Sequence, residues 1–193
     1  MMVKITIVVP VYNAEETIKR CLDSILNQTF TEFLVVIVND GSTDKTKDIL
    51  NDYNDKRIII INQENEGAGF ARNKALEIIK TKYVTFIDAD DYVDKDYLKQ
   101  LYENIKKADA DIACCNRIDD KEKIQIFNRE EALKNLLCLK EKYGVCIGAK
   151  LFKYSLIKNI RFDDNHFEDI KFILTCFLNS KKVVYNQKKI ILL

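Results

Sequence analysis

Short apolar runs alternate with segments of helical spacing along the first half of the chain. Residues 18–26 and 97–105 place their apolar side chains on one face of a helix. The apolar runs around them are rich in β-branched residues and are expected to form strands buried on both faces, at Ile5–Val9, Leu34–Val38, Arg57–Ile61 and Tyr83–Ile87. This alternation predicts an α/β fold of βαβ units, with a mostly parallel sheet flanked by helices and right-handed crossovers.

The second half of the chain has a less regular pattern. Strands are expected at 111–116, 124–127, 183–185 and 189–192. Helices are expected at 130–139 and 167–178, and a glycine-containing stretch at 143–148 lies before the second of them. The sequence shows no internal repeat, no low-complexity tract and no linker rich in Pro, Gly or Ser. We therefore interpret residues 1–193 as a single domain.

Composition and charge narrow the class of protein. The chain has 31 basic and 30 acidic side chains, with lysines scattered among acids, which argues against nucleic acid as a partner. The cysteines, at 21, 114, 115, 138, 146 and 176, lack the paired short spacing of a zinc site. The apolar runs are too short for a signal peptide or for a transmembrane segment, which needs about 20 residues. We expect a cytoplasmic protein with reduced thiols, and peripheral membrane association stays open.

Residues with special properties follow the predicted strands. Pro10 ends the first strand, and Gly41 follows the second in the segment NDGS. The glycines of ENEGAGF follow the third strand, and the fourth leads into the acidic segment DADD. In a parallel sheet these carboxyl ends lie along one edge, which is where open α/β sheets bind ligands. Four loops are therefore expected to converge on one crevice and to bring with them Asp40, Asp88, Asp90 and Asp91.

The segment Phe86–Asp91 carries three carboxylates within four residues, which repel one another unless a cation or hydrogen-bond donors compensate. Asp88 and Asp90 share a side if the extended backbone continues, because side chains alternate along a strand. A hard cation such as Mg²⁺ or Mn²⁺ often takes one or two protein carboxylates and completes its shell with water and phosphates. The alternative is that these acids cap the helix that begins near Asp94 or complement its dipole, and Asp94 itself fits a capping role.

Three side chains near the first two strands have open alternatives. As a carboxylate at the sheet edge, Asp40 could accept a hydrogen bond from a ring N–H of a base such as uracil, or it could form an Asx-type turn with Gly41. Tyr12 could stack on a base. Asn13 is a good helix N-cap, with Glu16 as its partner in a capping box.

Two cations and one acidic pair are further candidates. Arg72 falls in the first turns of the helix after EGAGF, where its two N–H groups suit a diphosphate, and the alternative is a solvated helical arginine. Lys150 in GAKLF is a second candidate cation. Either acid of Glu168–Asp169 could act as a general base, although acids are common in a first helical turn for dipole reasons. The single histidine, His166, is a weak candidate for a metal ligand.

Taken together, these segments resemble the family 2 glycosyltransferases, which have a GT-A-type, Rossmann-like fold. Four blocks carry the resemblance through residues 5–98 in the family's order, namely PVYNAEETIKRCLDSILNQTF, VIVNDGSTDKT, NEGAGFARNKAL and YVTFIDADDYVDKDYL. It continues more faintly in AKLFKYSLIKNIRF and FEDIKF. The resemblance implies a nucleotide-binding half over 1–110 and an acceptor-side half over 111–193. Family members usually carry more chain after the ED helix, so a truncated acceptor-side half is an open alternative.

By this resemblance the chain is an inverting, metal-dependent glycosyltransferase of polysaccharide biosynthesis. It would move a sugar from a nucleotide diphosphate donor, by family habit UDP-linked, to a hydroxyl of a carbohydrate or glycan acceptor. Asp40 would recognise the base, Asp88 the ribose, and Asp90 the Mn²⁺ or Mg²⁺ ion that bridges the donor phosphates. Asp169 would be the catalytic base. The further residues of the donor pocket would be Pro10, Tyr12, Arg72, Ala89 and Lys150.

Other classes fit the motifs less well. A dinucleotide-dependent oxidoreductase needs GxGxxG after the first strand, where this chain has PVYNAEE, and a P-loop ATPase needs GxxxxGK[ST]. A nucleotidyltransferase would carry a glycine-rich loop in place of PVYN, and a phosphatase with an aspartyl nucleophile would carry its acids after the first strand. The remaining alternative is a non-catalytic or truncated module that binds a nucleotide sugar without turnover.

Overall fold

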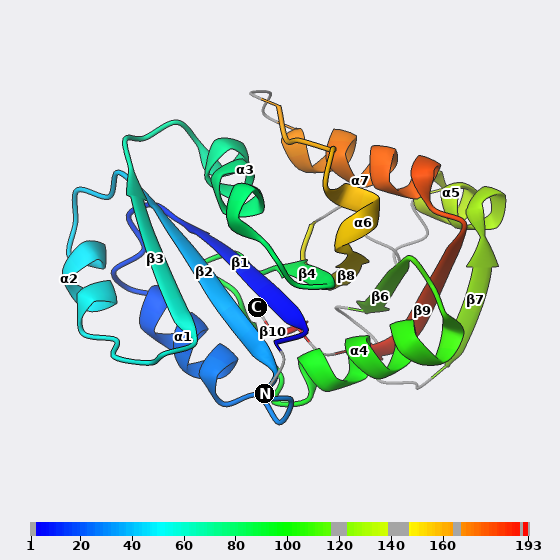
Figure 1. The fold of residues 1–193 in the computed structure, drawn as a ribbon, viewed down its shortest axis with the longest axis horizontal. Coiled ribbons are helices and arrows are strands. Elements are labelled where there is room, and N and C mark those ends of the chain that lie inside the picture. Colours follow the sequence, from blue (N-terminus) through cyan, green and yellow to red (C-terminus); the bar gives the residue numbers. More distant parts are fainter. Residues whose placement is uncertain (1–2, 117–122, 139–146, 164–166, 190, 193) are drawn as a thin grey trace.

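The computed structural model describes residues 3–116, 123–138, 147–163, 167–189 and 191–192. The chain forms a large central sheet with helices on both faces (Figure 1). The helices α1 and α4 lie on one side of this sheet, and α3, α6 and α7 lie on the other. The α/β fold predicted from the alternating pattern is confirmed.

The first half of the chain contains every strand and helix predicted for it. Its strands are β1 (Ile5–Val11), β2 (Phe33–Asp40), β3 (Ile58–Gln63), β4 (Tyr83–Phe86) and the short β5 (Tyr92–Val93). Its helices are α1 (Ile18–Leu26), α2 (Thr46–Asn51), α3 (Ala68–Ile78) and α4 (Tyr97–Ala108).

The second half adds strands to the same sheet. Its strands are β6 (Ile112–Asn116), β7 (Ile124–Asn128), β8 (Lys150–Lys153), β9 (Lys182–Lys189) and β10 (Ile191–Leu192). Its helices are α5 (Arg129–Leu137), α6 (Tyr154–Ile157) and α7 (Glu168–Asn179). The pattern did not predict β8 or α6, which span four residues each. Residues 143–146 of the glycine-containing stretch lie outside the described residues.

The large sheet has the strand order β3-β2-β1-β4-β8-β6-β9-β7. Strands β3, β2, β1 and β4 are parallel to one another, and β6 is parallel to β9. Only β8 and β7 run against their neighbours. The prediction of a mostly parallel sheet is confirmed. Because β1 and β4 are paired neighbours, the loops that follow them lie side by side at the carboxyl edge.

One prediction about the strands is wrong. The strand β3 is not buried on both faces, since it forms one edge of the sheet and Ile59 is 39% exposed. The closing strands expected at 183–185 and 189–192 are present as β9 and β10, although β9 is longer than predicted. β9 lies between β6 and β7, and β10 pairs antiparallel with β5 in a separate two-stranded sheet.

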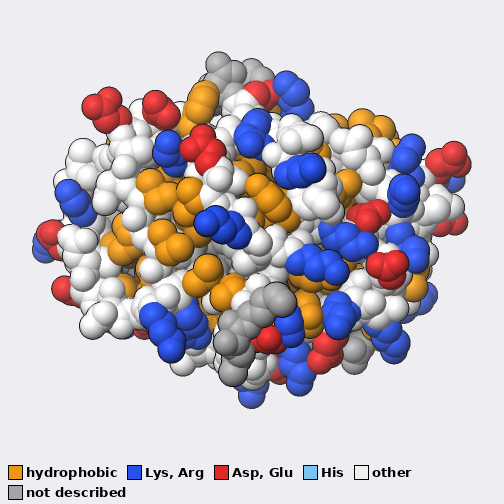
Figure 2. Space-filling model, viewed as in Figure 1, with side chains coloured by type: hydrophobic (Ala, Val, Ile, Leu, Met, Phe, Trp, Pro, Cys, Tyr) orange, Lys and Arg blue, Asp and Glu red, His pale blue; other side chains and the backbone are white. Residues whose placement is uncertain are grey.

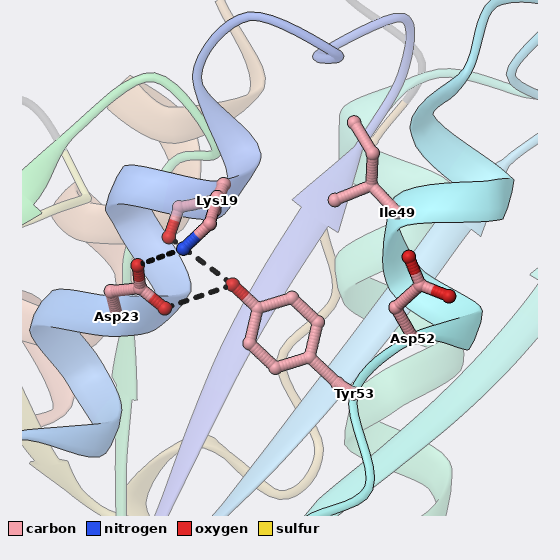
Figure 3. A pocket seen from close by; sticks show the side chains of 5 residues that line it. All are labelled: Lys19, Asp23, Ile49, Asp52 and Tyr53. Atoms are coloured by element: carbon pink, nitrogen blue, oxygen red, sulfur yellow. Dashed lines mark hydrogen bonds and ion pairs between the residues drawn. The ribbon is translucent and has the colours of Figure 1, made fainter.

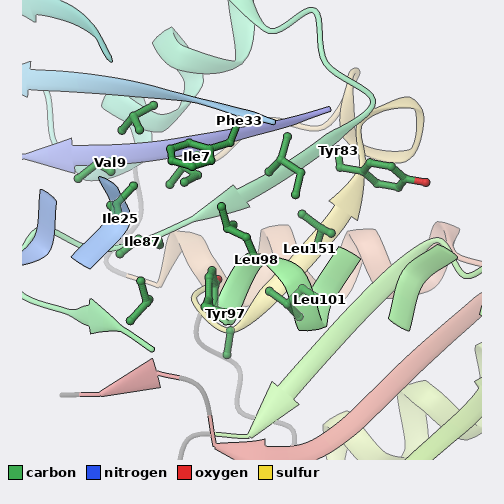
Figure 4. Packing of buried hydrophobic residues seen from close by; sticks show 14 of the residues in the cluster. Ile7, Val9, Ile25, Phe33, Tyr83, Ile87, Tyr97, Leu98, Leu101 and Leu151 are labelled. Carbon is green, nitrogen blue, oxygen red and sulfur yellow. The ribbon is translucent and has the colours of Figure 1, made fainter. Parts of the chain in front are cut away.

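Alternate residues of β1 face two separate cores, as the period of a strand requires. Ile7 and Val9 belong to the core beneath α1 and α4, and Val8 belongs to the core beneath α3 and α7. Figure 4 shows the first of these cores, in which Leu98 and Leu101 of α4 pack close to the sheet. Full burial of each such side chain contributes roughly 1.5–3 kcal/mol. The two cores together hold the carboxyl ends of β1 and β4 in fixed positions.

The loop after β1 is fastened to the loop after β2, and this contact replaces the predicted capping box. The N-cap of α1 is Thr17, and it makes no side-chain capping bond. Asn13 has a positive φ of 47°, and its Oδ1 accepts the backbone N–H of Thr43 at 2.8 Å. Its own backbone N–H donates to Oγ of Ser42 at 3.0 Å. Asn13 therefore joins two loops at the sheet edge instead of beginning a helix.

The surface carries basic and acidic side chains interspersed with apolar ones over the face shown in Figure 2. Among the residues that the structure describes, no helix combines the length and the apolar character needed to cross a membrane.

Candidate active site

A cavity of about 500 Å³ opens at the carboxyl ends of β1 and β4. Three chain segments form its wall, namely the loop after β1, the start of α3 and the turn after β4. The lining residues are Pro10, Tyr12, Asn13, Ala14, Thr17, Ala68, Arg72, Asp88, Ala89 and Asp90. The structure thus brings together six of the residues predicted for the site. Asp40, Lys150 and Asp169 do not line this cavity.

The acidic segment after β4 forms a turn. The strand ends at Phe86, and the backbone N–H of Asp91 donates to the carbonyl of Asp88 at 3.1 Å. The assumption that an extended backbone places Asp88 and Asp90 on one side is therefore wrong, although the turn still directs both residues to the cavity wall. Neither acid caps α4, whose N-cap is Asp96.

Asp90 is exposed, and its backbone is held from the side of α1. Nη2 of Arg20 donates to the carbonyl oxygen of Asp90 at 3.0 Å, and the Arg20 guanidinium lies 4.4 Å from the centroid of the Tyr92 ring. Below the turn, the thiol of Cys21 donates to the carbonyl of Asp88 at 3.6 Å, and burial raises the pKa of Cys21 to about 12, so this thiol stays protonated. Sequence reasoning missed Arg20, because a basic residue on an exposed helix face carries no distinctive signal.

Arg72 is buried, with only 4% of its surface exposed, and is surrounded by carboxylates. Its Nη2 lies 2.9 Å from Oδ1 of Asp88, and its Nη1 lies 2.9 Å from Oε1 of Glu168. Oδ1 of Asp169 lies 3.1 Å from the same Nη1. The alternative of a solvated helical arginine is therefore wrong. The two N–H groups predicted to bind a diphosphate are engaged by acids of this chain.

Asp169 stands in the first turn of α7, behind Arg72. Its Oδ2 accepts the backbone N–H of Ile147 at 3.2 Å, and its side chain is 24% exposed. Burial is the main cause that raises the pKa of Asp169 above its ordinary value, and the nearby charge of Asp88 adds to the shift while Arg72 opposes it. A carboxylate with a raised pKa is a stronger proton acceptor than an ordinary aspartate.

Asp40 is buried and forms hydrogen bonds within the protein. One oxygen accepts the side-chain N–H of Gln63 at 2.7 Å and the backbone N–H of Glu66 at 2.9 Å. The other oxygen accepts the backbone N–H of Gly67 at 2.8 Å. Both carboxylate oxygens therefore hold the loop between β3 and α3. The predicted turn with Gly41 is not the main role of this side chain, and the contact with a base stays a prediction.

The remaining candidates lie away from the cavity or cannot be placed. Lys150 is 1% exposed within β8, and its carbonyl oxygen accepts the hydroxyl of Thr85 at 2.8 Å. His166 lies outside the described residues. Asp94 supports the turn before α4 through its Oδ1, which accepts the backbone N–H of Asp96 at 2.9 Å.

A second cavity, of about 330 Å³, lies between α1 and α2 and, like the first, is lined by one basic and two acidic side chains. Figure 3 shows that Lys19 and the hydroxyl of Tyr53 both point to Asp23. The Lys19–Asp23 distance is 2.6 Å, and the Tyr53 hydroxyl donates to Asp23 at 3.1 Å. Asp23 in this cavity is already paired with Lys19 and Tyr53, whereas Asp90 at the sheet edge has an exposed carboxylate.

The family of the chain follows from sequence comparison. The family model described as "Glycosyl transferase family 2" matches residues 6–182. The chain belongs to this family of glycosyltransferases, and the family predicted from the motifs is confirmed.

Individual relatives agree with this assignment. Glycosyltransferase GlyA of Streptococcus pneumoniae serotype 4 is 37% identical over 207 residues, which cover 97% of this chain and 30% of GlyA. The poly(ribitol-phosphate) beta-glucosyltransferase of Bacillus spizizenii is 33% identical over 199 residues, which cover 93% of this chain and 30% of that protein. The chain thus spans under a third of the length of these two relatives.

A solved structure supports the GT-A-type fold. The crystal structure of S. aureus TarS 1–349 superimposes with a TM-score of 0.83 at 25% identity, over 97% of this chain and 59% of that one. TarS 1–349 has also been solved in complex with UDP and with UDP-GlcNAc, at 26% identity to this chain. The predicted fold class is confirmed.

Proposed function

We propose that the cavity at the ends of β1 and β4 binds the nucleotide diphosphate of a sugar donor. We further propose that the protein transfers the sugar, with inversion, to a hydroxyl of a carbohydrate acceptor. The observation that carries this proposal is the wall of the cavity, where the half-exposed ring of Tyr12 and the exposed carboxylate of Asp90 face one space of about 500 Å³. The UDP and UDP-GlcNAc complexes of TarS support a UDP-linked donor.

Within this proposal the base stacks on Tyr12, which is 50% exposed in the cavity wall. Asp88 accepts a hydrogen bond from a ribose hydroxyl through the oxygen that Arg72 leaves available. Pro10 and Ala89 supply the apolar part of the wall. Residues 1–110 act as the nucleotide-binding half of one domain, and residues 111–193 act as the acceptor-side half.

The residues of the wall fit a divalent cation of the Mg²⁺ or Mn²⁺ type. In the part of the chain that the structure describes, no group of three or more His, Cys, Asp or Glu side chains forms a complete metal site. An exposed carboxylate such as Asp90 suits an ion that takes its other ligands from water and donor phosphates. We propose Asp90 as the residue that holds it. When bound, the ion neutralises negative charge on the departing diphosphate.

Asp169 is the proposed catalytic base. It accepts the proton of the acceptor hydroxyl while the hydroxyl oxygen forms a bond to the anomeric carbon. The bond between that carbon and the diphosphate oxygen breaks at the same time, so the sugar is inverted and the nucleotide diphosphate leaves. The raised pKa of Asp169 and its place in the first turn of α7 support this role.

The test is a transfer assay with purified protein, Mn²⁺, UDP-GlcNAc and a panel of glycan acceptors, in which UDP release and the anomeric proton of the product are followed by NMR. The proposal predicts UDP release and a product of inverted configuration. Donor binding without any UDP release, with acceptor or with water, would favour the alternative of a non-catalytic donor-binding module. A product of retained configuration would contradict the single displacement.

A further inference from the structure

Three residues on one side of α3 contact the start of α7 or the residues 162–163 that precede it. Gly69 permits the close approach, since a Cβ at this position would lie 2.9 Å from the carbonyl oxygen of Asp163 and 3.3 Å from Cγ of Glu168. Arg72 follows almost one turn later and contacts the acids at the start of α7. Asn73 is the third residue. These contacts join segments about ninety positions apart in the sequence.

Asn73 binds both backbone groups of a single residue. Its Nδ2 donates to the carbonyl of Phe162 at 2.8 Å, and its Oδ1 accepts the backbone N–H of Phe162 at 2.9 Å. The Phe162 ring stacks on the ring of Phe172 in α7, with centroids 3.9 Å apart and an interplanar angle of 3°. The Arg72 guanidinium lies 5.3 Å from the centroid of the Phe162 ring. Asn73 therefore fixes a residue that packs against both Arg72 and the helix that carries Asp169.

Arg72 joins the two ends of the site. One side of its guanidinium contacts Asp88 in the cavity wall, and the other contacts Glu168 and Asp169. Two buried atoms in this cluster, Nε of Arg72 and Oδ1 of Asp169, make no hydrogen bond among the described residues. The contact of Oδ1 with Nη1 of Arg72 is an ion pair without hydrogen-bond geometry. Arg72 thus contacts three acids and holds them at fixed separations, although these two polar atoms stay without a hydrogen bond.

We propose that Arg72 and Asn73 are positioning residues that fix Asp169 relative to Asp88. This inference rests on the proposed function, in which Asp88 contacts the donor and Asp169 accepts the proton of the acceptor. A misplacement of about 1 Å between reacting groups is sufficient to cost about 100-fold in rate. Asn73 does not line the donor cavity, so it would act on the rate of transfer while leaving the affinity for the nucleotide unchanged. Arg72 lines the cavity and pairs with Asp88, so its substitution would act on both the rate and the affinity.

The first experiment compares kcat, the KM for donor and the Kd for UDP in the variants Arg72→Lys and Asn73→Ala. The matched control is Lys74→Ala, since Lys74 is exposed on the same helix and pairs only with Glu77 at the surface. We expect kcat to fall about tenfold in Asn73→Ala, with the Kd for UDP within about twofold of wild type, and kcat to fall further in Arg72→Lys. A loss of UDP affinity of tenfold or more in Asn73→Ala, or an unchanged kcat in both variants, would overturn the inference.

A second experiment does not depend on turnover. Urea unfolding of wild type, Arg72→Lys, Asp169→Asn and the double variant forms a double-mutant cycle. We expect the two substitutions to be coupled by at least about fivefold in the unfolding equilibrium constant, because Lys cannot hold two acids in a fork as Arg does. Additive effects would contradict the positioning role of Arg72 even if the protein transfers sugar. If the two substitutions are coupled but the protein binds no UDP, the result would contradict the proposed function and would still support the contact between Arg72 and Asp169.

Discussion

The carboxylate of Asp40 accepts the backbone N–H of Gly67 at 2.8 Å, so the end of β2 is tied to the residue that caps α3. Gly67 has a φ of +99°, a conformation that favours glycine. The hydrogen bond from Gly67 to Asp40 stabilises this conformation, and the backbone N–H of the neighbouring Glu66 donates to the same carboxylate. Asp40 therefore sets the position from which α3, and with it Arg72, enters the site.

We predict that Asp40→Ala destabilises the protein by about 3 kcal/mol. The substitution removes the acceptor of two backbone N–H groups and one side-chain amide, all at partly exposed positions, and each lost hydrogen bond contributes about 0.5–1.5 kcal/mol. Asp40→Asn keeps one acceptor oxygen and should cost less. Urea unfolding of the three proteins provides the measurement. A stability of Asp40→Ala within about 0.5 kcal/mol of wild type would show that the loop does not depend on this carboxylate.

The sequence was sufficient to predict the fold and to bring most of the candidate residues to one cavity at the sheet edge, because buried parallel strands and the loops at their carboxyl ends have strong local patterns. It was not sufficient to predict pairings between distant side chains. The contacts of Asp40 with Gly67, of Asn13 with Thr43, and of Arg72 with the acids of α7 depend on how loops meet in space. No local sequence pattern shows which loops meet. The turn expected at Asp40 and the capping box expected at Asn13 therefore gave way to contacts between loops, and the alternative of a solvated Arg72 was wrong.

The close packing of α3 against α7 makes Gly69 sensitive to substitution. We predict that Gly69→Ala destabilises the protein by roughly 1–3 kcal/mol, because the added Cβ would lie 2.9 Å from a backbone carbonyl that cannot rotate away. Thermal unfolding monitored by circular dichroism measures the change, with Lys74→Ala as the control on the same helix. Equal melting temperatures for Gly69→Ala and wild type would mean that α3 and α7 can accommodate the added methyl group without a loss of stability.

Asp169→Asn is expected to lower kcat by about 10²- to 10⁴-fold, because the amide cannot accept the proton of the acceptor hydroxyl. The Kd for UDP should stay close to that of wild type, since Asp169 does not line the donor cavity. Steady-state kinetics and calorimetry on the same preparation separate the two effects. Turnover retained at the wild-type rate would remove Asp169 from the mechanism.

The raised pKa of Asp169 also predicts a pH dependence of stability. The folded state holds the Asp169 proton more tightly than the unfolded chain does, so the contribution of this group to stability is fully present below the unfolded pKa of about 3.9 and is lost as pH rises through the folded pKa. Asp169→Asn cannot ionise. Urea unfolding should therefore show that the stability of the variant relative to wild type increases with pH across this interval. A constant difference would contradict the raised pKa.

The central claim is that Asp90 binds the cation on which nucleotide diphosphate affinity depends, and it is tested most directly by calorimetric titration of UDP into wild type and Asp90→Ala. Glu103→Gln on α4 serves as the control, because Glu103 is an exposed acid outside the cavity wall. We predict that in Mn²⁺ the variant binds UDP at least about tenfold more weakly than wild type and the control, a difference of about 1.4 kcal/mol. We also predict that chelation of the metal reduces wild type to the level of the variant. Equal UDP affinity of Asp90→Ala and wild type in Mn²⁺ would contradict the account.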